Sequence, residues 1–187
     1  MLNALLSLAL GAAAPIQPAS SITTGVAIAT CFAPEENCSA FAVNAINGAE
    51  REILVSAYSL TTGSGIPDAL ARAAGRGVEV RLIADRSTPC ERKAGIDMLA
   101  HAGAAVWIDR GVRIAHAKTM VIDGKVTLVG SMNWSAGAAQ NSENLNLVVS
   151  PEVAESYAVH WRQRLAASVR YAGREEWCRG RTAGNGL

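Results

Sequence analysis

The chain has 187 residues, of which 50% are hydrophobic, and 17 basic residues against 16 acidic ones give it a formal net charge of +1. This length and composition suit one domain with a sizeable core. The near-neutral charge excludes a surface that is basic overall, so recognition of a polyanion would have to come from a local patch.

The first 21 residues predict a signal peptide. Residues 1–14 are apolar and nearly uncharged, and Pro15 and Pro18 end this run, which is too short to span a bilayer. An Ala-x-Ser sequence ending at Ser21 fits a cleavage site, although no Lys or Arg precedes the apolar run. The alternative is an N-terminus that is disordered or packs on the core. We expect a periplasmic or secreted protein.

The four cysteines agree with export. They form an even set without a Cys-x-x-Cys pair, which favours disulfides over a zinc site. The short loop from Cys31 to Cys38 favours a bridge between these two, which leaves Cys90 to pair with Cys178. Four cysteines allow three connectivities, and four reduced, buried thiols remain the alternative.

Strands and helices alternate along the chain. The predicted strands are 26–32, 53–60, 78–84, 105–108, 116–122 and 126–129, and the predicted helices are 39–49, 67–75, 93–102 and 151–167. This order predicts an α/β fold, with a mixed β-sheet flanked by helices on both faces, in a single domain over residues 22–171. The aromatic stripe of the last helix is expected to be core. Residues 172–187 are expected to be an Arg- and Gly-rich C-terminal tail.

The most informative stretch is the predicted hairpin. Alternation places His116 and Lys118 on one face of its first strand, and Asp123 and Gly124 form its turn. The second strand ends at Gly130, which leaves room for a ligand, and the small polar residues Ser131 and Asn133 follow. An imidazole can attack phosphorus or deliver a proton, and the ammonium and small polar groups can hold anionic oxygens.

The spacing His-x-Lys, four residues, Asp, six residues, Gly-Ser-x-Asn resembles the signature of the phospholipase D superfamily. The runs Asn141-Ser142-Glu143-Asn144 and Ala57-Tyr58-Ser59-Leu60 resemble its single-motif bacterial endonuclease branch. The resemblance implies a phospholipase D-like domain that hydrolyses phosphodiesters through a phosphohistidine. Lys118 and Asn133 would stabilise charge on the phosphate, with Ser131 supporting them, and neither a metal nor another cofactor would be needed.

The two carboxylates of these motifs are expected to differ in role. By strand parity Asp123 lies on the face opposite His116, so we expect a structural role for it. Glu143 is the better candidate to orient His116 through its second ring nitrogen, as a carboxylate does in hydrolytic triads.

The chemistry asks for two histidines, and the chain carries one such motif. His101 and His160 have no lysine two residues away. The resemblance therefore implies a homodimer in which two copies of His116 share one composite active site.

Three substrates or roles remain open from the sequence. A non-specific endonuclease acting on DNA or RNA is favoured, because Arg86, Arg110 and Arg113 could follow a phosphate backbone. A phospholipase D acting on phospholipid or cardiolipin would want an interfacial surface, for which Val106, Trp107 and Ile108 are candidates. The third is a non-catalytic module that binds nucleic acid or anionic lipid, and the intact His116 and Lys118 argue against it.

Overall fold

The computed structural model describes residues 25–179. The predicted signal peptide lies outside these residues. Within residues 25–179, no helix is both long and apolar enough to cross a membrane.

Eight strands form one sheet in the order β1-β7-β6-β5-β2-β3-β4-β8. They are β1 Ala27–Ala33, β2 Glu52–Ala57, β3 Glu79–Asp85, β4 Ala105–Asp109, β5 Thr119–Ile122, β6 Val126–Gly130, β7 Glu143–Val149 and β8 Ser168–Arg170. Strands β2, β3 and β4 pair in parallel, and all other neighbours are antiparallel. The prediction of a mixed sheet is confirmed.

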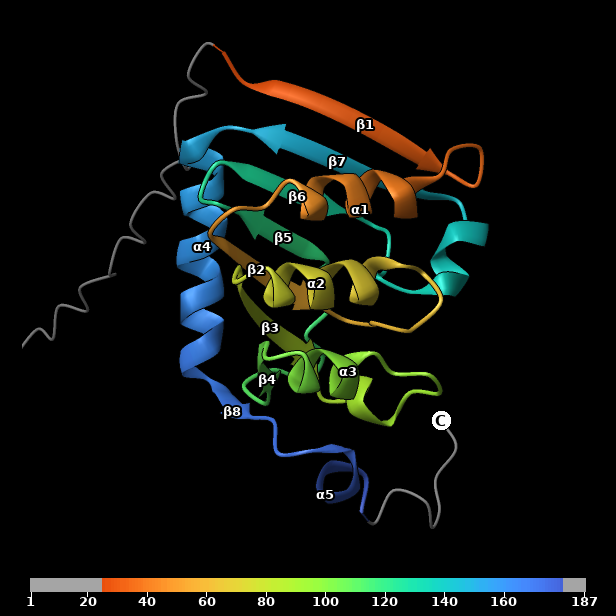
Figure 1. Ribbon diagram of the computed structural model, residues 1–187, viewed down its shortest axis with the longest axis vertical. Helices are drawn as coiled ribbons and strands as arrows, with labels where there is room; N and C mark the ends of the chain where they lie inside the picture. The colour runs from red at the N-terminus through yellow and green to blue at the C-terminus, as the bar shows by residue number, and fades with distance from the viewer. Residues whose placement is uncertain (1–24, 180–187) are drawn as a thin grey trace, which may run out of the picture.

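Helices cover both faces of the sheet, as predicted (Figure 1). They are α1 Cys38–Asn47, α2 Ile66–Gly75, α3 Ile96–His101, α4 Pro151–Ala166 and α5 Arg174–Cys178. Helices α1, α2 and α3 lie side by side on one face, and α4 runs across the other. Ser150 caps α4, since its hydroxyl accepts the Val153 N–H at 3.3 Å.

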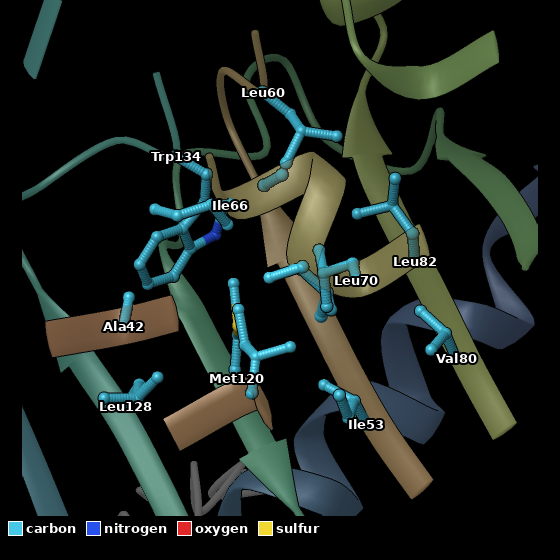
Figure 2. Packing of buried hydrophobic residues seen from close by; sticks show 14 of the residues in the cluster. Ala42, Ile53, Leu60, Ile66, Leu70, Val80, Leu82, Met120, Leu128 and Trp134 are labelled. Carbon is cyan, nitrogen blue, oxygen red and sulfur yellow. The ribbon is translucent and has the colours of Figure 1, made fainter. Parts of the chain in front are cut away.

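The main core lies between the sheet and α1–α3 (Figure 2). Ile66 and Leu70 of α2 are fully buried against Ile53, Leu82 and Met120 of the central strands. Alternate residues of these strands face α4, where Leu54, Ile83 and Val121 pack against Ala158 and Trp161. The aromatic stripe of α4 therefore belongs to the core, as expected.

Both expected disulfides are present, Cys31–Cys38 and Cys90–Cys178. The predicted domain boundary at residue 171 is too early, because the second bridge ends at Cys178, beyond residue 171. Residues beyond it form α5, whose Trp177 packs against the main core, so the folded unit continues through the first part of the predicted tail. Residues 180–187 of that tail lie outside the described part.

The hairpin and strand β7 also differ from the prediction. The first strand of the hairpin begins at Thr119, so His116 and Lys118 lie in the segment just before it. Strand β7 was not predicted, although its Leu145 and Leu147 alternate with the polar Asn144 and Asn146 in the two-residue period of a strand.

The topology brings many segment ends to one edge of the sheet. The parallel strands β2, β3 and β4 end at this edge, and β5, which is antiparallel to β2, begins there. By the same alternation β6 ends and β7 begins at this edge. The residues that follow or precede these strands therefore lie near one another.

Candidate active site

The turn of the β5–β6 hairpin is fixed by Asp123. Its carboxylate accepts the backbone N–H groups of Glu50, Arg51 and Glu52 at 2.8–3.0 Å. Burial by itself would raise the pKa of Asp123, but the three N–H donors favour the charged form and leave the pKa below its ordinary value. These contacts join the turn to the start of β2 and fit the structural role predicted for Asp123.

The other end of the hairpin carries His116 and Lys118. The Lys118 ammonium lies 3.1 Å from His116 Nδ1 and donates to the His116 carbonyl at 2.8 Å. The Tyr58 ring, which follows β2, lies against both groups, 4.4 Å from the His116 ring centroid and 4.7 Å from Lys118 Nζ. Imidazole and ammonium are therefore held together at the sheet edge, although they precede the strand.

Lys118 is only 6% exposed, whereas His116 is exposed to solvent. Burial lowers the pKa of Lys118 below its ordinary value, and the negative charge of Glu143 offsets part of this fall. Within residues 25–179 no carboxylate forms a salt bridge with it. A buried cation without an ionic partner is costly unless an anionic ligand completes the site.

Ser131 and Glu143 join the ends of β6 and β7. The Ser131 hydroxyl donates to Glu143 and accepts the Asn144 N–H at 3.0 Å, and Asn141 Nδ2 donates to Glu143 at 3.3 Å. The orientation of His116 by Glu143 within one chain is not seen, since His116 Nδ1 faces Lys118 and the carboxylate of Glu143 faces Ser131 and Asn141.

Glycine is required at position 130 for a reason other than the open space predicted there. A Cβ at this position would lie 2.1 Å from the backbone oxygen of Asn144 on β7. The close approach of the two strands therefore requires glycine, and contact of Gly130 with substrate stays a prediction. Asn133, three residues later, has a buried Oδ1 atom without a hydrogen-bond partner in the described part of the chain. That oxygen can only accept, so contact of Asn133 with a phosphate, which would use its Nδ2 group, stays a prediction.

Two buried aspartates that the sequence analysis missed hold the loop before His116. Asp109 accepts the Gly111 N–H at 2.8 Å and pairs with Arg164 through two contacts of 2.7 and 2.8 Å. Asp85 accepts the Ala115 N–H at 2.7 Å. Both are the last residues of parallel strands, β4 and β3. A carboxylate that directly follows an apolar strand was the signal that could have identified them.

A cleft of about 270 Å³ opens beside His116 on the α4 side of the sheet. Its lining includes Ala57, Ile83, Val112, Ile114 and, from α4, His160. Val112 and Ile114 are partly exposed there, with 38% and 47% of their surface accessible. The interfacial surface predicted from Val106, Trp107 and Ile108 is wrong, because Val106 and Ile108 are buried and Trp107 packs against α4.

Two of the predicted arginines lie on the loop that leads from β4 to His116. Arg110 follows β4, and its guanidinium lies 5.9 Å from the Trp177 ring centroid. Arg113 is exposed on the loop between Asp109 and His116. Their contact with substrate stays a prediction.

The site places an exposed imidazole beside a buried ammonium, a pair that suits attack on a phosphate. Within residues 25–179 no three His, Cys, Asp or Glu side chains are grouped so that they could hold a metal ion.

Comparisons with known proteins agree with this site. The family model described as a cardiolipin synthase, PLD-like domain matches residues 42–165. A phospholipase D of Rickettsia conorii is 37% identical over 142 residues, which are 75% of this chain and 70% of that protein. The structure of Nuc from Salmonella typhimurium, a phospholipase D family member, matches with a TM-score of 0.74 and 28% identity over 79% of this chain and 99% of that one. NucT from Helicobacter pylori shares the fold, with a TM-score of 0.73, 23% identity, and coverage of 79% and 100%.

The fold and the site thus define a phosphodiester hydrolase with a His-x-Lys motif. The chain belongs to the phospholipase D superfamily.

Proposed function

We propose that the protein is a non-specific nuclease that cleaves DNA or RNA at His116. The observation that carries this proposal is the loop from Arg110 to Lys118. It bears Arg110, Arg113 and His116, and Asp109 and Asp85 hold it against the sheet edge at both ends. A strand whose phosphate lies at His116 can therefore meet further cations on the same loop. The likeness to Nuc over nearly the whole of that chain supports the proposal.

The reaction has two steps. A ring nitrogen of His116 forms a bond to phosphorus, the bond from phosphorus to the leaving alcohol breaks, and a second, protonated histidine gives that alcohol its proton. Water then attacks the phosphohistidine, its proton passes to the second histidine, and the phosphate monoester leaves. Lys118 and Asn133 hold the non-bridging oxygens, and Ser131 supports them through the β6–β7 junction.

The geometry of His116 supports a homodimer. An ammonium group can only donate, so Nδ1 accepts from Lys118 and a neutral ring carries its proton on Nε2. Attack by Nε2 needs the other tautomer, in which Nδ1 donates to an acceptor. Because Glu143 does not supply that acceptor within its own chain, we propose that Glu143 of a second copy does so. The same copy brings the second His116.

The surface of the monomer is consistent with such a partner. On β1, Ile28 and Phe32 are 63% and 54% exposed, on the face opposite the buried Cys31 and Ala33. Phe32 pairs with Asn144 at the start of β7, near the site. An apolar strip beside the catalytic edge is suited to an interface between copies.

Mixed dimers test the shared site. When wild-type and His116→Ala chains are unfolded and refolded together, activity should fall as the square of the wild-type fraction. A linear fall, or full activity in a protein that sediments as a monomer, would contradict it. His160 lines the cleft beside His116, so His160→Ala is the matched control. It should keep its activity, because the second histidine is proposed to come from the partner.

The substrate is tested with the purified protein on plasmid DNA, single-stranded RNA, phosphatidylcholine vesicles and cardiolipin vesicles. Hydrolysis of DNA and RNA that persists in excess chelator is the expected result. Activity confined to lipid would overturn the nuclease, and activity restored only by added magnesium would overturn the metal-free mechanism.

A phospholipase D is the second candidate, because the cleft beside His116 is mainly apolar and carries the partly exposed Val112 and Ile114. The name of the Rickettsia relative supports the same candidate. Ile114→Ser should then slow hydrolysis of phospholipid vesicles much more than that of a small chromogenic diester. Equal effects on both substrates would remove this candidate.

Export is also part of the proposal. The two disulfides support an oxidising compartment, since such bridges are rare in the cytosol. Protein isolated from its native compartment should show no free thiol after denaturation and should lack residues 1–21. Four titratable thiols would contradict both the export and the periplasmic or secreted location.

A further inference from the structure

A second cavity, of about 430 Å³, opens at the same edge of the sheet as His116. Its lining residues are Arg86, Arg110, Glu176 and Trp177. Arg86 and Arg110 directly follow β3 and β4, whereas Glu176 and Trp177 belong to α5. The cavity is therefore closed by a segment that lies beyond residues 42–165, which the family model matches.

Trp177 is fixed in this cavity from three sides. Its indole N–H donates to the Arg86 carbonyl at 3.0 Å, and the neighbouring Cys178 is bridged to Cys90. The ring also packs partly against the main core. A half-buried indole held in this way presents its remaining surface at little further entropic cost, which suits stacking against a planar group.

Arg110 supplies an exposed cation to the cavity. Its guanidinium lies 5.9 Å from the Trp177 ring centroid, close to the outer limit of about 6 Å for a cation–π contact. In the described part of the chain it forms no salt bridge. Arg110 can therefore turn towards a phosphate without giving up a strong interaction. Glu176 adds an acceptor for an amino group of a base or a hydroxyl group of a sugar.

The cavity is connected to the catalytic loop. Arg110 and His116 lie six residues apart on one loop, so at most about 22 Å separates them even in a fully extended chain. Asp85, next to Arg86, holds the other end of that loop through the Ala115 N–H. The cavity thus lies within the length of a few nucleotides from His116, so one strand can reach both.

We propose that this cavity binds one nucleotide of a single-stranded substrate outside the scissile position, with its base stacked on Trp177 and its phosphate held by Arg110. The proposal rests on the proposed nuclease function and gives it a substrate subsite built by the C-terminal segment.

Binding is measured first, in the His116→Ala background so that the probe is not cut. A short, labelled, single-stranded oligonucleotide should bind about tenfold more weakly when Arg110→Gln or Trp177→Leu is added, as expected for loss of one phosphate contact or one stacked base. Arg170→Gln is the matched control, because Arg170 makes a similar contact, 4.6 Å from Trp107, and should leave binding unchanged. Should Trp177→Leu fail to fold, Trp177→Phe is expected to keep binding, and Arg110→Gln carries the comparison.

Turnover is measured next, with His116 intact. The two variants should raise KM for the oligonucleotide about tenfold with little change in kcat, and should affect a small chromogenic diester less. Equal binding by all variants, no binding of the oligonucleotide, or weaker binding of cardiolipin vesicles alone would overturn the subsite. Binding that depends on Arg110 and Trp177 in a protein that cuts no nucleic acid would keep the subsite and reject the nuclease.

Discussion

At the turn of the β5–β6 hairpin, the Asp123 carboxylate accepts three backbone N–H groups at 2.8–3.0 Å. At the other end of the same hairpin, the buried Lys118 has no salt-bridge partner, and nearby Asn133 has an unpaired buried oxygen, among the described residues. Both ends belong to one sequence signature. The first end is complete without a ligand, whereas at the second end the Lys118 ammonium lacks an ionic partner within residues 25–179, and unpaired buried polar groups of this kind are typical of functional sites.

The largest expected effect is on turnover, at the end of the hairpin that carries His116 and Lys118. His116→Ala should lower kcat by at least about a thousandfold, because it removes the proposed nucleophile. Its midpoint of thermal unfolding should stay close to that of the wild type, because His116 is exposed and fills no core. Substantial turnover by a folded His116→Ala protein would reject the mechanism.

Lys118→Met should lower kcat by about 100- to 1,000-fold, the usual cost of losing a group that stabilises transition-state charge. Lys125→Met is the matched control, since Lys125 is exposed at the turn end of the hairpin and should be neutral. Equal activity of the two variants would mean that Lys118 does not contact the phosphate.

The two ends of the β5–β6 hairpin differ in how far the sequence predicted their structure. The Asp123-Gly124 turn follows from local chemistry, because both residues adopt positive φ, 54° and 66°, which Asp and Gly tolerate better than most. The pairing of His116 with Lys118 was found through spacing, although the two precede the strand. Residues linked by a short spacing were therefore found, whereas the alternation in β7 and the carboxylates that end β3 and β4 were local signals that were overlooked.

What was missed depends on contacts between distant segments. Asp85 acts on Ala115, 30 residues away, and Trp177 reaches Arg86, 91 residues away. The role of Gly130 likewise depends on the approach of β7. No short motif encodes such contacts, because the fold alone brings those residues together.

At the Asp123 end of the hairpin the expected effect is on the stability of the fold. Asp123→Asn should lower the free energy of unfolding by about 1–3 kcal/mol, because one amide oxygen replaces a charged acceptor of three N–H groups. Since the pKa of Asp123 is below its ordinary value, this contribution is present above the ordinary aspartate pKa and is lost as pH falls through the lowered one. Urea unfolding from neutral to acid pH should show the two proteins converging. Asp68→Asn, at an exposed position on α2, is the control.

The smallest expected effect is the change in folding stability caused by Lys118→Met. It contrasts with the large loss of activity expected of the same variant. Because burial lowers the pKa of Lys118, the charged side chain disfavours the folded state at neutral pH, and the unfolded chain binds more protons between the lowered and the ordinary lysine pKa. Wild-type stability should therefore gain from this group as pH rises through that window, and the variant should lack this gain. At neutral pH the variant should be as stable as the wild type or more so, although it is nearly inactive. Urea unfolding at neutral and alkaline pH measures the difference, and a clear loss of stability in Lys118→Met at neutral pH would show that Lys118 supports the fold, as Asp123 does.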